Sequence, residues 1–209
     1  MKKLMIIAVL VGLLVFAVAT SAFAESSGTY YLGYADNDMD TGSHGIIGME
    51  INSSDSLLHR VGVDFFNSTA KGNNGADGKL DGYKLKMGFD IISNDNFELY
   101  GIFSYLNLRG DSKTGNAEYE PLMVGIEAKL NLNERMYIDG SVDCAVGEKE
   151  YKRTGVGDVD ADYMAAKVKF NYLFTEKFGV NVGYSWDKLD VSGKKTNTKG
   201  LTSAMVFRF

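Results

Sequence analysis

The segment LDGYKLKMGFDII, residues 80–92, alternates large apolar side chains with charged residues and glycines. From Tyr83 to Ile91 one parity reads Tyr, Leu, Met, Phe, Ile, while the other parity, from residue 82 to 90, reads Gly, Lys, Lys, Gly, Asp. An amphipathic helix would space its apolar residues three and four apart. The period of two therefore predicts a strand whose two faces meet different surroundings. The charged face excludes a strand that is buried on both sides.

The same alternation recurs along most of the chain. Ten segments show it: 29–35, 45–52, 59–66, 80–92, 97–105, 121–130, 135–146, 164–174, 178–186 and 201–209. Short polar turns and longer polar loops alternate between these segments, which predicts an up-and-down series of antiparallel hairpins. A single proline, Pro121, and 24 glycines suit a continuous sheet, as do 12 Tyr and 12 Phe. No linker divides the series, so we expect one domain over residues 25–209.

The first 24 residues have a different pattern. Lys2 and Lys3 precede an apolar run over residues 4–19, and Ala22 and Ala24 are small residues at the positions that a signal peptidase reads. This is the pattern of a secretory signal peptide cleaved before Glu25. The alternative is a membrane anchor, but the run is shorter than the roughly 20 residues that span a bilayer as a helix. We therefore predict residues 1–24 to be a cleaved signal peptide.

The two faces of the predicted hairpins differ sharply in chemistry. One face carries apolar and aromatic side chains. The other carries the charges that we expect to line a barrel lumen: Glu50, Arg60, Asp64, Lys84, Lys86, Asp90, Glu98, Glu127, Lys129, Asp139, Asp143, Lys167, Lys169 and Arg208. A soluble sandwich or lipocalin-like barrel would bury the apolar face and expose the charged one. A membrane barrel turns the apolar face to lipid and the charged face inward.

Aromatic residues near the strand ends favour the membrane barrel. One group lies toward the short turns, and the other lies toward the longer loops, as in the two interfacial belts of membrane barrels. The turn-end group is Phe97, Phe174, Phe178, Phe207 and Phe209, and the loop-end group is Tyr34, Phe65, Tyr83, Tyr105, Tyr163 and Trp186. Together with the signal peptide, this pattern predicts an antiparallel up-and-down transmembrane β-barrel of about ten strands.

The chain resembles the small bacterial outer-membrane β-barrel proteins of the OmpX and OmpA-barrel type. The signal peptide, the glycine- and aromatic-rich hairpins and the terminal MVFRF carry the resemblance. Members of this type usually have eight strands, so the resemblance implies eight strands as the alternative to ten. In that family the final strand ends in Phe, which the outer-membrane assembly machinery recognises, and Met205, Phe207 and Phe209 match this pattern. The resemblance implies a monomer in the outer membrane, with lipids, lipopolysaccharide and the assembly machinery as partners.

Charge bears on function. Without Lys2 and Lys3 the chain has 20 basic and 27 acidic residues, a balance that argues against nucleic-acid binding. The expected lumen holds seven acids and seven bases, so we expect a charge-paired and largely filled interior. The predicted role is a non-enzymatic barrel that holds polar extracellular loops for surface interaction or envelope integrity, with extracellular partners unknown. The alternative is a narrow porin-like channel for small solutes or ions.

No catalytic or metal-binding constellation stands out, so we expect no enzyme, cofactor or metal. His44 and His59 lie in different connections, and the pair Ser43-His44 is weak support for an acyl hydrolase. A surface protease would need an Asp–His pair, for which the sequence has no motif. Two Asp-x-Asp-x-Asp runs, at 36–40 and 158–162, lack the Gly and Glu of a calcium hand. Cys144 is expected to be a small lipid-facing residue.

Overall fold

The computed structural model describes residues 27–37, 41–52, 60–71, 77–112, 115–147, 150–155 and 157–208. The predicted signal peptide with Ala22 and Ala24 lies outside the described residues, as do His59 and Phe209. No helix in the described part of the chain is long and apolar enough to span a membrane.

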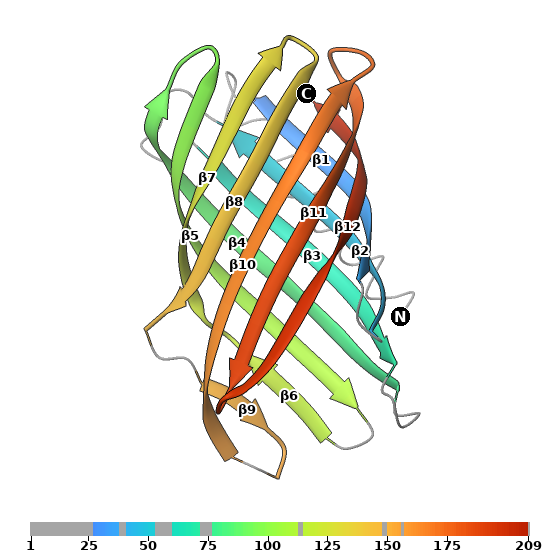
Figure 1. The fold of residues 1–209 in the computed structure, drawn as a ribbon, viewed down its shortest axis with the longest axis vertical. Coiled ribbons are helices and arrows are strands. Elements are labelled where there is room, and N and C mark those ends of the chain that lie inside the picture. The colour runs from blue at the N-terminus through green and yellow to red at the C-terminus, as the bar shows by residue number, and fades with distance from the viewer. Residues whose placement is uncertain are drawn as a thin grey trace, which may run out of the picture.

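Twelve strands make up the described fold (Figure 1). They are β1 (Ser27–Asn37), β2 (Thr41–Asn52), β3 (Arg60–Lys71), β4 (Asp77–Ser93), β5 (Phe97–Ser112), β6 (Gly115–Tyr119), β7 (Leu122–Asn133), β8 (Met136–Val146), β9 (Glu150–Arg153), β10 (Gly157–Leu173), β11 (Phe178–Val191) and β12 (Lys194–Arg208).

Ten of these strands form a closed antiparallel ring. Among the described residues the order is β1-β2-β3-β4-β5-β7-β8-β10-β11-β12, and β12 pairs with β1 from Thr29↔Arg208 to Asn37↔Gly200. The predicted ten-stranded barrel is confirmed. The sequence did not predict β6 and β9, which were assigned to loops. They pair with each other and extend the wall between β5 and β10 at the loop end.

The wall is interrupted where β6 and β9 join it. Residues 161–163 of β10 lie between its ladder with β9, which ends at Asp160↔Glu150, and its ladder with β8, which begins at Met164↔Cys144. Tyr119, which is fully buried, donates its hydroxyl hydrogen bond to the carbonyl of Ala161 at 3.2 Å. The side chain thus satisfies a backbone group beside the interruption.

Three tight turns share one device at the opposite end of the barrel. Asn94 Oδ1 accepts hydrogen bonds from the amides of residues 96 and 97, and Asn133 Oδ1 does the same for residues 135 and 136. Thr175 Oγ1 accepts from the amides of residues 177 and 178. Such side chains replace backbone partners in turns, which explains why the short connections predicted here are turns.

One connection that the sequence predicted as a long loop is a two-residue turn. Ser192 and Gly193 join β11 to β12, and both have positive φ, 50° and 83°. Positive φ at both central residues is the mark of a type I′ turn, which suits the twist of a hairpin. The two strands therefore continue as a ladder to Val191↔Lys194.

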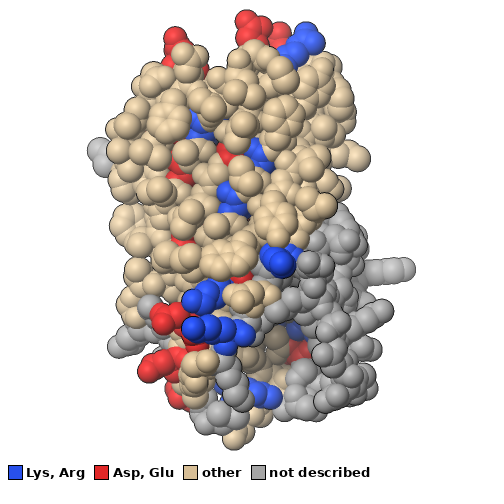
Figure 2. Space-filling view, viewed as in Figure 1, with Lys and Arg blue, Asp and Glu red and all other residues tan. Residues whose placement is uncertain are grey.

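The outer surface of the ring is apolar. Phe103, Ile126 and Val182 are each more than half exposed, and 24 large hydrophobic side chains of the described residues are exposed in all. Figure 2 shows a mostly uncharged wall with a few charged atoms visible in its middle; charged residues lie at the upper rim and gather most densely toward the lower end, where β6 and β9 lie in Figure 1. Such a wall suits contact with hydrocarbon and not with water.

Aromatic side chains border this apolar wall. At the turn end Phe178 lies 5.2 Å from Phe207 and 5.7 Å from Phe174, measured between ring centroids. Toward the loop end Tyr83 lies 6.4 Å from Phe65 and 6.1 Å from Tyr105.

Tyr163 was wrongly assigned to the loop-end belt. It has the parity of Lys167 and donates a hydrogen bond to Asp187 Oδ1 at 2.8 Å. Nearness to a strand end suggested the belt, but side-chain parity decides which face a residue takes. The side chains of Tyr34 and Phe209 lie outside the described part of the structure.

Candidate functional site: the charged lumen

The face opposite the apolar wall carries the charged residues. Arg60, Lys86, Glu127 and Asp143 are each 5% exposed or less. Their strands belong to a closed ring, so side chains of this parity converge on the lumen. Burying so many charges is costly unless each finds a partner. The positions of the partners therefore decide what the lumen can do.

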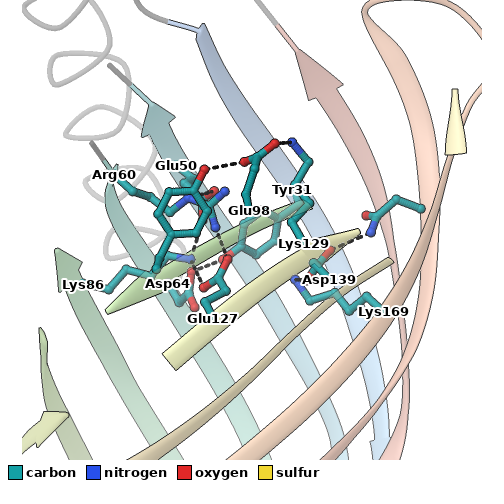
Figure 3. Close-up of polar contacts among 12 residues, drawn as sticks. Tyr31, Glu50, Arg60, Asp64, Lys86, Glu98, Glu127, Lys129, Asp139 and Lys169 are labelled. Atoms are coloured by element: carbon teal, nitrogen blue, oxygen red, sulfur yellow. Dashed lines mark hydrogen bonds and ion pairs between the residues drawn. The ribbon is translucent and has the colours of Figure 1, made fainter. Parts of the chain in front are cut away.

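Four charges form a network at the centre of this face (Figure 3). Arg60 on β3 contacts Glu50 through Nε at 3.1 Å and also contacts Glu127 on β7. Lys86 on β4 contacts Glu50 and lies 3.2 Å from Glu127 Oε2. The ring of Tyr100 packs 4.0 Å from the Arg60 guanidinium. Each carboxylate thus meets two cations.

These contacts cross the lumen instead of following the wall. Two strands, β4 and β5, separate Arg60 from Glu127 in the ring. A second crossing joins Lys84 Nζ on β4 to Asp143 Oδ2 on β8 at 2.9 Å, with β5 and β7 between them. The ion pairs therefore tie β3 and β4 to β7 and β8 through the interior.

Glycines on the inward face leave room for the long side chains that form these contacts. Gly62 lies between Glu50 and Lys86 in the cross-strand register, and a Cβ there would be 2.7 Å from Lys86 Cε. Gly48 lies likewise between Tyr31 and Asp64, and the ring of Tyr31 covers it. Tyr31 donates its hydroxyl to Asp64 across this glycine. An alanine at either position would obstruct the crossing side chain.

A second set of contacts lies on neighbouring strands. Lys129 Nζ is 2.7 Å from Glu98 Oε1, which also receives a hydrogen bond from Asn131. Asp139 accepts a hydrogen bond from Asn171 at 2.6 Å, and Lys169 Nζ lies 3.6 Å from its other oxygen.

Three further predicted lumen charges have different surroundings. Arg208 packs its guanidinium 4.8 Å from the ring of Tyr137. Asp90 and Lys167 lie on the inward parity of β4 and β10, where they pair in register with Tyr100 and Ser141.

Tyrosines and amides complete the lumen, although the predicted lumen set contained charged residues alone. Tyr31, Tyr100, Tyr137 and Asn171 all contact the charged groups named above. Their parity, opposite to the apolar face of each strand, was the signal that could have identified them. Aromatic residues were predicted to form the interfacial belts, and the tyrosines of the charged face were left out of the lumen set.

A cavity of about 400 Å³ lies between the charge network and the turn end of the barrel. Its walls come from β1–β4, β7, β8 and β10–β12, and the turn at residues 174–177 contributes Glu176 and Lys177. Arg60, Lys86 and Glu127 line its inner part, while Thr29 and Arg208 pair at the end of the β1–β12 ladder. The cavity thus reaches from the network toward the turns.

Other candidate sites gain no support from the described residues. The part of the chain that the structure describes holds no group of three or more His, Cys, Asp or Glu side chains placed to bind a metal ion. His44 lies in β2 and His59 lies outside the described ranges. Cys144 is a free, half-buried cysteine on the outward parity of β8.

Comparisons with known proteins bear on the fold. No family model matches the chain, and no curated protein matches its sequence. Among solved structures, the COG4313 outer membrane channel from Pseudomonas putida F1 matches with a TM-score of 0.51 at 12% identity, over 88% of this chain and 95% of that one. The chain has the fold of an outer-membrane β-barrel.

Two further solved structures match less closely in shape. The translocator domain of the autotransporter NalP from Neisseria meningitidis has a TM-score of 0.47 at 14% identity, over 99% of this chain and 96% of that one. The KdgM porin has a TM-score of 0.38 at 11% identity, over 85% of this chain and 97% of that one.

Proposed function

We propose that this protein is a non-enzymatic, monomeric barrel of the outer membrane whose lumen is closed by ion pairs and which holds polar loops at the cell surface. The observation that carries the proposal is the position of Glu127. Its carboxylate meets Arg60 and Lys86 from across the lumen, and all three residues are at most 5% exposed. A water-filled pore would leave such groups hydrated.

The partners proposed for this barrel follow from its outer surface. Lipid acyl chains would cover the apolar wall, and lipopolysaccharide would meet the charged band at the loop end (Figure 2). Met205 and Phe207 are exposed on the outward face of β12, where the assembly machinery would bind them together with Phe209. A Phe207→Ala change should then lower the yield of barrel in outer-membrane fractions.

Single-channel recording in planar bilayers tests the closed lumen. The wild-type protein should give no steady conductance. Replacing Arg60 and Glu127 together by alanine should open a path through the network and produce steady channels. The control pair is Arg109 and Glu118, which lie 3.0 Å apart on the exposed face and should have no effect when both become alanine. Steady wild-type channels that change on Lys84→Gln would contradict the proposal.

The second candidate is a narrow channel for small ions or solutes. The cavity of about 400 Å³ favours it, as do the buried hydroxyls of Ser104 and Ser141, which have no hydrogen-bond partner among the described residues. Buried polar groups of this kind are often bridged by ordered water. The matching Pseudomonas putida structure is itself named a channel. The same recordings separate the two candidates.

An enzymatic role is the weakest candidate, and turnover of lipid A, phospholipid or peptides by the purified barrel would revive it.

A further inference from the structure

We propose that the cavity at the turn end of the lumen binds the carboxylate or phosphate group of a small solute, with Arg208, Lys169 and Asn181 as the binding residues. All three line the cavity of about 400 Å³. This volume lies within the range of roughly 300–1,000 Å³ that is usual for small-molecule sites. The inference does not depend on whether the lumen conducts.

The charge balance of the cavity favours an anion. Its described lining holds six basic side chains and four acidic ones: Arg60, Lys86, Lys129, Lys169, Lys177 and Arg208 against Glu50, Glu127, Asp139 and Glu176. Glu50 and Glu127 neutralise Arg60 and Lys86, and Glu98 neutralises Lys129. Asp139 and Glu176 offset two of the three remaining bases, Lys169, Lys177 and Arg208, so the lining keeps a surplus of one positive charge.

Arg208 is the strongest candidate for contact with a ligand. No carboxylate of the described residues lies within 4.0 Å of its guanidinium, which instead packs against the ring of Tyr137 at 4.8 Å. Arg208 also forms a side-chain hydrogen bond with Tyr137, but a guanidinium has five N–H donors, so several remain to bind a ligand. The edge of the guanidinium matches two oxygens of a carboxylate or phosphate.

Lys169 lies at the same cavity and is only loosely paired. Its Nζ is 3.6 Å from Asp139 Oδ1 and 5.2 Å from the ring of Tyr31. Asp139 already accepts the shorter hydrogen bond from Asn171. The ammonium group can therefore turn toward an anion without leaving that carboxylate without a partner.

Asn181 supplies an independent observation. It is 5% exposed and lines the cavity, yet no described residue forms a hydrogen bond with its side-chain amide. Because Asn181 opens onto the cavity, its NH₂ group is placed to donate a hydrogen bond to an oxyanion bound there. A metal cation is disfavoured, since the carboxylates that line the inner cavity already have basic or amide partners.

Isothermal titration of the folded full-length protein in detergent micelles tests the site. The probes are inorganic phosphate and sodium acetate at constant ionic strength, with choline chloride as the cation probe. The wild type should bind both anions saturably and should not bind choline. Arg208→Gln should weaken phosphate binding at least tenfold, and Asn181→Asp should abolish it by placing a carboxylate in the cavity. Arg135→Gln is the matched control, because Arg135 is an exposed arginine at the same end outside the cavity lining.

Two outcomes would overturn the inference. The first is the absence of saturable binding to wild type, and the second is equal weakening by Arg135→Gln, which would indicate general surface charge. A heat-dependent gel shift reports whether each variant folds. If Arg208→Gln fails to fold, Arg208→Lys serves as the second variant, because it keeps the positive charge. Weaker phosphate binding by Arg208→Lys would support a two-pronged hydrogen bond from the guanidinium to the anion. If the protein binds anions and also conducts ions, the closed-lumen proposal is wrong but the anion site is still supported.

Discussion

Glu127 is the residue on which the interior network depends most. It is the carboxylate that both Arg60 and Lys86 meet from the far side of the lumen. Removing one member of a buried ionic group leaves the others without compensation, at a cost of about 3–5 kcal/mol. We expect Glu127→Gln to lower the free energy of unfolding by about 3 kcal/mol, measured by urea titration in lipid vesicles. The control is Glu118→Gln, whose exposed partner Arg109 should make the loss under about 0.5 kcal/mol; equal losses would show that the crossing pairs are hydrated.

Tyr119 offers a separate test at the interruption of the wall. Tyr119→Phe removes the hydroxyl that donates to the Ala161 carbonyl. Leaving that buried carbonyl without its partner should cost about 1 kcal/mol of unfolding free energy, measured as a shift in the urea midpoint. Tyr151→Phe is the control, because Tyr151 packs 6.3 Å from Tyr119 without a hydroxyl bond to any described residue. If Tyr119→Phe leaves the urea midpoint unchanged, water donates the missing hydrogen bond to the Ala161 carbonyl.

Parity in the sequence was enough to place single residues but not to pair them. Lys84, Lys86 and Glu127 lie on the charged face that the alternation predicted. Their partners lie two or three strands away along the ring, as in the contact from Lys84 to Asp143. Such distances depend on strand tilt and on how the ring closes. Neither quantity is encoded in the period of two.

At the scale of the strand, close packing of backbones at glycines sets a limit on substitution. A Cβ at Gly125 on β7 would lie 2.3 Å from the Val142 carbonyl oxygen on β8. Gly125→Ala should therefore cost about 1–3 kcal/mol through overpacking, measured by urea unfolding. Gly140→Ala on β8 has a nearest contact of 3.2 Å and should cost less. A larger loss of unfolding free energy for Gly140→Ala than for Gly125→Ala would show that the ladder between β7 and β8 can shift to accommodate a side chain.

Turn chemistry explains which connections the sequence predicted well. The short turns at Asn94, Asn133 and Thr175 carry side chains that bond their own backbone, and such residues mark turns in sequence. The turn at Ser192 and Gly193 was harder to recognise. The polar residues on both sides of it belong to strands that extend beyond the apolar wall, where hydrophobic alternation no longer marks a strand. The same holds for β6 and β9.

For the whole molecule, the decisive property is that the apolar face of the strands points outward and the charged face points into the lumen. Ile126 is 53% exposed near the middle of the apolar wall. An arginine there should cost about 2–4 kcal/mol in a bilayer, measured by urea unfolding in vesicles. Asn116→Arg on β6 is the control, because Asn116 is exposed on the loop-end extension, and its cost should be about 0–1 kcal/mol. Equal costs for the two variants would contradict a lipid-facing wall.

Closure of the ring affects whether an incomplete chain can associate with other copies of itself. The last strand, β12, pairs with the first, β1, along nine residue pairs. Until those final residues join, the sheet is an open ribbon with two bare margins, each with unpaired amides and carbonyls. A truncated chain would keep both margins and could stack onto a second copy of itself. The seam between first and last strand is thus also the safeguard against fibrous association.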